Sequence, residues 1–481
     1  MHFKKIVSSP LFFVVFSLIV LFLGYSENLW KAANTQIYFE KNHSFLRNLD
    51  IPEFQNFPEI YWTFDRYSES LVLGRLVKSR KDGLLSSGGL VGRFLDYQQP
   101  PDMYTGNKLT HAYQYKIYFD ESLDNKVNLF VTYNSQSGGQ ALLLGIFDKI
   151  IPGTNAFKLK FFYRLAALLT TLAVFLIIFW FYREFGVFTG WFLVFCFAFF
   201  STPTLYAKSI WWVPWAFYIP FLLILYSFYM EDNSCKKLSF LFIFLLSFSG
   251  MLIKIFLNGF EFISSTIVMA AIPLFYYNIK SKWGLRKLIY RLITFGGGVA
   301  LSCIISIILL SFQFVLAGET FSDGIYHIYN SLLRRTYIAI SPGYQESVSD
   351  PVYNVVAHYI TTPRKINFPG IGIGYNISMK HILLVFLAVT LLWLFFIRRL
   401  RINGDCIKIN ALTATLWISI LAPLSWFVLF KAHSSIHKLQ DPIVWFMPFM
   451  FYGIGLLGIT AEKFLRAVWF SKRMQVIKQN L

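Results

Sequence analysis

The chain has 481 residues, of which 56% are hydrophobic, 19% aromatic and only 14% charged. Its hydrophobic residues come in continuous blocks that a soluble core of this length would not need, so the composition excludes an ordinary soluble protein. The formal net charge of +19 does not indicate a nucleic-acid partner, because much of the basic excess lies at expected helix ends, where membrane topology and anionic lipids both favour it.

We predict an all-α polytopic membrane protein with about ten transmembrane helices, since the hydrocarbon layer tolerates only internally hydrogen-bonded backbone. The stretches are 7–25, 161–182, 187–204, 213–230, 238–256, 260–278, 292–316, 381–397, 409–430 and 442–461. The first follows Lys4 and Lys5 but lacks small residues at its exit, which favours an uncleaved helix over a secretory signal. If the spans alternate, the basic stretches at 4–5, 280–291, 398–408 and 463–478 share one side, which we expect to be the cytoplasm.

The spans divide the chain into five parts. These are a first transmembrane helix (1–25), a long outer loop with surface helices (26–160), transmembrane helices two to seven (161–317), a second outer loop (318–380), and transmembrane helices eight to ten with a cytoplasmic tail (381–481). Within the outer loops we expect helices over 66–82, ending at Gly83, over 141–151, and around 325–333. The polar mass on one face indicates that the protein works there, and we expect a bacterial inner (plasma) membrane with the site on the periplasmic or outer face.

Two acids, Asp65 and Glu69, lie in the first outer loop, which follows the first span. An acid at the membrane boundary can act as a general base on an acceptor hydroxyl while cations hold a phosphate leaving group. Glu69 is the first candidate and Asp65 the second. The alternative is that both only solvate a surface helix and pair with Arg66 and Arg75.

A second group of ionisable residues lies between the fifth and sixth spans. Lys254 precedes the turn Asn258-Gly259, and Glu261 follows it. Ionisable groups at or within the bilayer are costly and usually face a cavity or a partner. A lysine that reaches the interface, or a Lys254–Glu261 ion pair, is the structural alternative.

The link between the ninth and tenth spans, FKAHSSIHKLQDP, carries Lys431, His433, His437, Lys438 and Asp441. The two histidines are four apart, which would place them on one helix face and also suits zinc, but no HExxH motif or cysteine partner accompanies them. We expect the cluster to recognise a phosphate or a sugar, or else to form a wet turn. None of the four cysteines (Cys196, Cys235, Cys303, Cys406) lies in a large outer loop, so neither a disulfide framework nor a metal cluster is implied.

Aromatic and basic residues mark two further outer segments. Lys208 beside Trp211 and Trp212 could bind a phosphate and stack on a sugar ring, although tryptophan is common at the headgroup level of any membrane protein. The second long loop holds Arg334 and Arg335, with His327, His358 and Arg364-Lys365. A basic loop above the bilayer fits a polyprenyl phosphate or diphosphate, as it fits anionic lipids. No Walker loop or dinucleotide fingerprint is present.

The order of these features resembles the GT-C superfamily of polyprenyl-phosphate-dependent glycosyltransferases, in particular the branch of the protein mannosyltransferases and the aminoarabinose transferase of lipid A. Glu69, Arg75 and Gly83 match the acidic residue, arginine and closing glycine of that branch, and Gly250 with Lys254 matches the end of its fifth span. Ser135–Gly153 and Ala207-Lys208 are also similar. Trp211-Trp212 replace the expected second acid, so no metal or other cofactor is implied, and the Lys-Pro-Pro element is absent. The resemblance covers roughly residues 60–260.

The resemblance implies an integral membrane glycosyltransferase. It would transfer a sugar from a polyprenyl-phosphate carrier to a glycan, glycolipid or protein acceptor on the outer face. Glu69 or Asp65 would activate the acceptor, while Lys208, Lys254 and the 431–438 cluster would neutralise the phosphate. The alternatives are a polysaccharide polymerase or ligase using diphosphate-linked glycans, and a lipid-linked sugar flippase or transporter.

Overall fold

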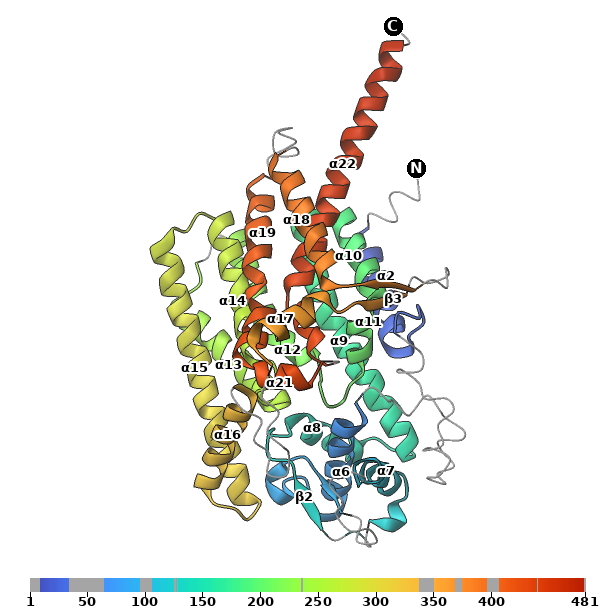
Figure 1. Ribbon diagram of the computed structural model, residues 1–481, viewed down its shortest axis with the longest axis vertical. Coiled ribbons are helices and arrows are strands. Elements are labelled where there is room, and N and C mark those ends of the chain that lie inside the picture. The colour runs from blue at the N-terminus through green and yellow to red at the C-terminus, as the bar shows by residue number, and fades with distance from the viewer. Residues whose placement is uncertain are drawn as a thin grey trace.

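The computed structural model describes residues 9–33, 65–95, 106–124, 127, 129–234, 237–336, 350–367, 374–395, 406–438 and 440–479. Long helices form a bundle, and a small unit built from α6, α7 and α8 lies at one end of it, opposite the end from which α22 projects (Figure 1). The expectation of a helical protein is confirmed. Two short antiparallel ribbons, β1 with β2 and β3 with β4, were not expected from the sequence.

A helix lies at each of the ten apolar stretches. The bundle comprises α2 (Pro10–Glu27), α9 (Asn155–Phe185), α10 (Val187–Phe199), α11 (Ser201–Ala207), α12 (Trp215–Ser234), α13 (Phe240–Asn258), α14 (Ile263–Lys280), α15 (Leu285–Leu316), α18 (Met379–Phe395), α19 (Cys406–Ser419), α20 (Leu421–Leu429) and α22 (Phe449–Gln479). Within the described part of the chain, five helices are long and apolar enough to cross a membrane, or six if α10 and α11 form one bent span. This agrees with a multi-pass membrane protein, and the number ten stays a prediction.

Several boundaries differ from the predicted ones. The stretch 187–204 bends by 70° between α10 and α11, because Phe200 is extended and Pro203, which lacks an N–H donor, fits in the first turn of a new helix. The stretch 442–461 begins as the 3-10 helix η5 (Asp441–Phe446), and α22 starts after Pro448. The α22 helix then continues through most of the predicted tail.

The first outer segment folds into the unit at the end of the bundle. It contains α6 (Arg66–Asp82), η2 (Ser86–Gly89), β1 (Gly92–Phe94), α7 (Gly106–Phe119), η3 (Glu121–Leu123), β2 (Phe130–Thr132) and α8 (Gly139–Ile150). The helix expected over 66–82 is confirmed. It is capped by the Asp65 side chain, which accepts from the Ser68 amide, and it ends at Gly83, whose φ of 96° favours glycine.

Buried ionic contacts join this unit together. The Arg80 guanidinium donates to both carboxylate oxygens of Asp148 on α8, at 2.6 and 3.0 Å, and to Asn155 at the start of α9. Lys158 also donates to the Asp148 backbone carbonyl. A bidentate pair of this kind fixes orientation as well as distance, so α6, α8 and α9 are held in one arrangement.

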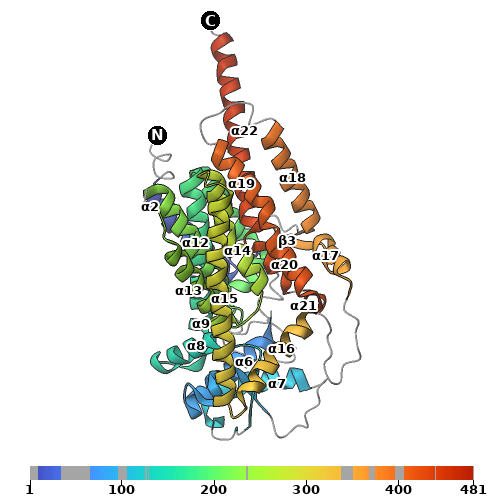
Figure 2. The same cartoon turned by 90° about the vertical axis from the view of Figure 1, so that its left-hand side faces the viewer.

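The second outer segment returns to the same end of the bundle. α15 runs down the side of the molecule and leads into the amphipathic α16 (Phe321–Thr336), which packs against α15 and α21 (Lys431–Ile436) (Figures 1 and 2). α17 (Val352–Thr361), β3 (Arg364–Asn367) and β4 (Gly374–Ile377) follow. Gln313 near the end of α15 donates to the carbonyls of Gly88 and Ser137, so the end unit is anchored to α15.

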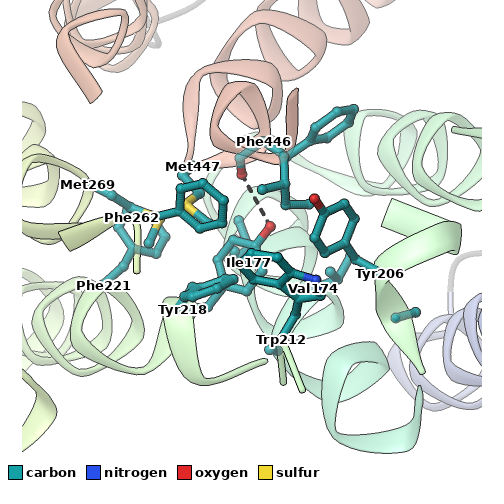
Figure 3. Close-up of a cluster of buried hydrophobic side chains, with 14 of the residues drawn as sticks. Val174, Ile177, Tyr206, Trp212, Tyr218, Phe221, Phe262, Met269, Phe446 and Met447 are labelled. Atoms are coloured by element: carbon teal, nitrogen blue, oxygen red, sulfur yellow. Dashed lines mark hydrogen bonds between the residues drawn. The ribbon is translucent and has the colours of Figure 1, made fainter. Parts of the chain in front are cut away.

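The core of the bundle next to the end unit is rich in aromatic side chains. Figure 3 shows part of it, where Trp212 lies among Tyr206, Phe262 and Tyr218. Trp212 and Phe262 stack at 5.5 Å between ring centroids, and the Tyr218 hydroxyl donates to the Phe446 carbonyl at 3.3 Å. Large rings with one satisfied polar atom have little freedom in such packing, and Trp212 is therefore held rigidly.

The opposite end of the bundle contains its own ionic cluster. Lys280 at the end of α14 pairs with Glu184 and, at 2.7 Å, with Asp232, while Arg291 pairs with Glu231 at 2.6 Å. The basic stretch 280–291, predicted to be cytoplasmic, thus lies far from α6 (Figure 1). Residues 398–401 and Cys235 lie outside the described residues, and Cys196, Cys303 and Cys406 are free thiols.

Candidate functional site

A polar cavity of about 500 Å³ lies where the end unit, α16 and the turns of the bundle meet. Six segments line it, namely the start of α6, residues 132–135 after β2, the turn between α11 and α12, the turn before α14, the inner face of α16, and the segment around α21. This volume is within the range of about 300–1,000 Å³ typical of small-molecule sites. The predicted site residues that line it are Asp65, Trp211, Trp212, Glu261, His433 and His437.

Of the two acids predicted as the general base, Asp65 is the one that lines the cavity. It precedes α6, where its Oδ1 accepts from the Ser68 amide at 3.3 Å and its Oδ2 accepts from the indole N–H of Trp212 at 2.8 Å. Burial raises the pKa of Asp65, the two donors lower it in part, and the nearby Glu261 charge adds to the increase. The carboxylate is thus held in place by two donors beside the cavity.

Glu69, the first candidate from the sequence, lies one helical turn deeper. Its side chain is fully buried, and it is absent from the described residues that line the cavity. The hydroxyls of Tyr115 and Tyr163 both donate to its Oε1, while Oε2 has no hydrogen-bond partner among the described residues. Burial raises the pKa of Glu69 to about 7, and the two tyrosines and the charge of Lys208 oppose this increase.

An ion pair closes the side of the cavity formed by α16. The Arg335 guanidinium donates to Oε1 of Glu261, and both side chains are nearly buried. The Oε2 atom of Glu261 faces Nε2 of His433 at 3.8 Å. The pair therefore joins α16 to the turn before α14 and to α21, three segments that are far apart in sequence.

The two histidines of the 431–441 segment share a face, as their spacing predicts. Their rings stack at 4.1 Å between centroids with an interplanar angle of 28°. Burial and, to a smaller extent, the neighbouring His433 lower the pKa of His437 to about 4, so His437 is neutral at pH 7. Within the described residues, no group of three or more His, Cys, Asp and Glu side chains is placed to hold a metal ion.

The two tryptophans form one wall. Trp212 holds Asp65, as described above, and Trp211 makes an edge contact with Tyr133 at 5.6 Å. Both rings are nearly buried and fixed by neighbours, but each contributes to the cavity surface. Such rings are suited to packing against the apolar face of a sugar.

Four predicted phosphate contacts lie outside the lining of the cavity. Lys254 is fully buried, and its ammonium donates to the backbone carbonyls of Gly259 (3.0 Å) and Glu261, so it fixes the turn that positions the Glu261 carboxylate. Arg75 is also buried and donates to carbonyls at 83–86, including that of Ser86 at 2.5 Å.

Lys208 and Lys431, the other two predicted phosphate contacts outside the lining, lie in different places. Lys208 is buried, and its ammonium lies 5.4 Å from the centre of the Tyr163 ring. Lys431 begins α21 and is half-buried. The Lys254–Glu261 ion pair, which the sequence offered as the structural alternative, is replaced by the contact to the backbone carbonyl of Glu261.

Arg334 and Arg335 line the cavity, although the sequence analysis named them only with the other basic residues of their loop and not among the predicted site residues. They lie in the last turn of α16, whose apolar and polar faces are well separated. This amphipathic pattern with two terminal arginines is the signal that marks them, since it predicts a helix at the membrane surface with its cations toward a polar partner.

One apolar pocket adjoins the polar cavity, and a second adjoins the first. The nearer one, of about 140 Å³, shares His327, Ser331 and Arg335 with the cavity and continues to Phe260 and Leu310. The second, of about 210 Å³, shares these last two residues and lies between α13 and α15. Its rim includes large side chains on the outer surface of the bundle, namely Phe256, Leu309, Phe312 and Leu316. The polar cavity and the two apolar pockets thus lie in a row, in which each space shares lining residues with the next.

Comparison with protein-family models, with curated proteins and with solved structures finds no match for this chain.

Proposed function

We propose that the protein is an integral membrane glycosyltransferase that takes a sugar from a polyprenyl-phosphate carrier and transfers it to a hydroxyl of a glycan, lipid or protein acceptor. The observation that carries this proposal is the row of spaces from the polar cavity to the surface between α13 and α15. A ligand with a sugar and a phosphate at one end and a long apolar chain at the other has its polar and apolar parts in the same order as these spaces.

The basic side chains of the cavity support a phosphate at the junction of the polar and apolar spaces. Arg335 lines both the cavity and the nearer apolar pocket, and Arg334 and His433 line the cavity. Preplaced cations in a site of low dielectric stabilise the charge that develops on a leaving phosphate without reorganisation during the reaction. We assign the phosphate to these three residues in place of Lys208 and Lys254.

Asp65 is the general base that accepts the proton of the acceptor hydroxyl in this proposal, and Glu69 lies one helical turn deeper. Its carboxylate borders the cavity and is held by Trp212 and Ser68, whereas Glu69 is enclosed by Tyr115 and Tyr163. A general base must reach the proton that it accepts. Asp65 meets this requirement on the same side of the cavity as the Trp211-Trp212 wall, where the sugar would pack.

The test uses the purified full chain in lipid nanodiscs. Labelled hexoses on a polyprenyl monophosphate, and in parallel on a polyprenyl diphosphate, are offered with extracts of membrane glycans and glycolipids, and release of the polyprenyl product is measured. Turnover of the monophosphate donor supports the proposal, and turnover of the diphosphate donor alone would replace it with a polymerase or ligase. Protein-dependent movement of intact donor across the bilayer without turnover would indicate a flippase.

Matched variants test the base. Asp65→Asn should lower turnover by about 10²-fold or more, the contribution typical of a general base. Asp82→Asn, the same change at the far end of α6, should have no comparable effect, because Asp82 pairs with Lys78 at 2.6 Å. A fully active Asp65→Asn protein with an inactive Glu69→Gln protein would move the base to Glu69.

A further inference from the structure

His433 lies between two carboxylates that come from different segments. Its Nε2 is 3.8 Å from Oε2 of Glu261, and its Nδ1 is 3.8 Å from Oδ2 of Asp441. Asp441 is fully buried, and its Oδ2 accepts from the indole N–H of Trp426 at 2.8 Å. Among the described residues, His433 Nδ1, Glu261 Oε2 and Asp441 Oδ1 are buried without a hydrogen-bond partner.

The surroundings fix the plane of the His433 ring. His437 stacks on one face, and Trp426 contacts it edge-on at 5.4 Å between centroids. With Nδ1 toward the buried Asp441 and Nε2 on the side of Glu261, the ring has one nitrogen near an orienting carboxylate and the other near the cavity. An imidazole that is fixed by ring contacts, with a buried carboxylate near one nitrogen and the cavity beside the other, is placed for proton transfer at the second nitrogen.

We propose that His433 is a catalytic residue that protonates the leaving phosphate of the transfer, and that Asp441 is its positioning residue. This inference rests on the proposed function. The acceptor oxygen forms a bond to the anomeric carbon while the bond from that carbon to the phosphate oxygen breaks, and the phosphate keeps the electron pair. The acceptor proton passes to Asp65, and the Nε2 proton of His433 passes to a phosphate oxygen. Exchange with water then removes the proton from Asp65 and restores it to His433.

The charges around the cavity are consistent with this division of labour. Arg335 is paired to Oε1 of Glu261 and leaves Oε2 toward His433, so a phosphate that meets the imidazole lies close to the guanidinium as well. Among the described residues, the titratable and charged groups that face the His433 ring are Glu261 from the turn before α14, Asp441 from η5, His437 just after α21 and, beyond Glu261, Arg335 from α16. His437, whose pKa is about 4, does not compete for the proton at neutral pH.

The first test requires neither the sugar nor the acceptor. Farnesyl phosphate is added to the full chain in nanodiscs, and the ³¹P resonance of the bound phosphate is followed from pH 5 to pH 8. An opposite charge within about 4–6 Å shifts a pKa by about 1–3, so the bound phosphate in the wild-type protein should titrate about one pH unit or more below that in His433→Gln. His381→Gln is the matched control, since His381 bonds to Ser378 at the start of α18 and should leave the titration unchanged.

The second test concerns turnover. His433→Gln should lower kcat by about 10²-fold or more. The loss of kcat should be smaller for a donor that carries fluorine beside the ester oxygen of the lipid, because the phosphate released from this donor is more acidic and needs less protonation. Asp441→Asn should lower kcat with little change in KM and should move the ³¹P titration in the same direction as His433→Gln. A purely structural role of either residue would affect both donors equally.

The two proposals fail differently. If the wild-type chain shows no saturable binding of farnesyl phosphate, the proposed function is overturned and this inference with it. If farnesyl phosphate binds and the wild type transfers sugar, but folded His433→Gln shows the same titration and the same kcat, the function stands and the role of His433 is refuted. Thermal melts establish that the variants are folded, and if His433→Gln is not, His433→Asn and Asp441→Asn decide the question in the same way.

Discussion

Glu69→Gln should change how the stability of the protein depends on pH. The wild-type carboxyl is fully buried, and its pKa in the folded state is about 7 against an ordinary value of 4.5. Between these values the folded state binds more protons than the unfolded state, so the free energy of unfolding falls as the pH rises. The stabilisation is complete below about pH 4.5 and is lost as the pH passes 7. With about 1.36 kcal/mol for each unit of pKa, the loss is roughly 3 kcal/mol.

The variant lacks this titration but keeps an oxygen that accepts from Tyr115 and Tyr163. Its free energy of unfolding relative to the wild type should therefore rise by roughly 3 kcal/mol between pH 5 and pH 8. Unfolding in mixed micelles, followed by tryptophan fluorescence, measures this difference at several pH values. Glu319→Gln, a change at an exposed site, should give parallel curves. Parallel curves for Glu69→Gln would refute the assignment of a buried carboxyl that is protonated at low pH.

Two further predictions concern packing around the cavity. Arg335→Gln should destabilise the protein by about 3 kcal/mol, because it leaves the Glu261 carboxylate buried without its counter-charge. In a double-mutant cycle with Glu261→Gln, the two changes should be coupled by more than about 1 kcal/mol. Additive effects would contradict a direct pair. Gly139→Ala should lower the free energy of unfolding by about 1–3 kcal/mol in the same assay, because the added Cβ would lie 2.4 Å from the Phe256 carbonyl oxygen. Gly296→Ala is the control and should not destabilise the protein, since no atom lies within 4 Å of its added Cβ. Equal effects of the two glycine changes would contradict the close approach of α8 to α13.

The site was partly predictable from the sequence. Polar residues in a membrane protein have to find a partner or a cavity, and on this basis the sequence marked Asp65, Glu261, His433 and His437 as candidate site residues. The structure places all four around one space. The same reasoning selected Lys254, which instead satisfies backbone carbonyls, because a sequence pattern shows that a charge needs a partner without showing which partner it finds.

The sequence by itself determined the helical class, the apolar stretches and the helix over 66–82, since these depend on local periodicity, on caps and on the cost of exposing backbone to lipid. The tertiary structure alone decided which acid borders the cavity. Asp65 and Glu69 are four residues apart, a spacing that places both on one side of a helix, but α7 and α9 supply Tyr115 and Tyr163 to enclose the deeper of the two. Depth in a packed interior is set by neighbours that are distant in sequence, and the local pattern contains no information about them.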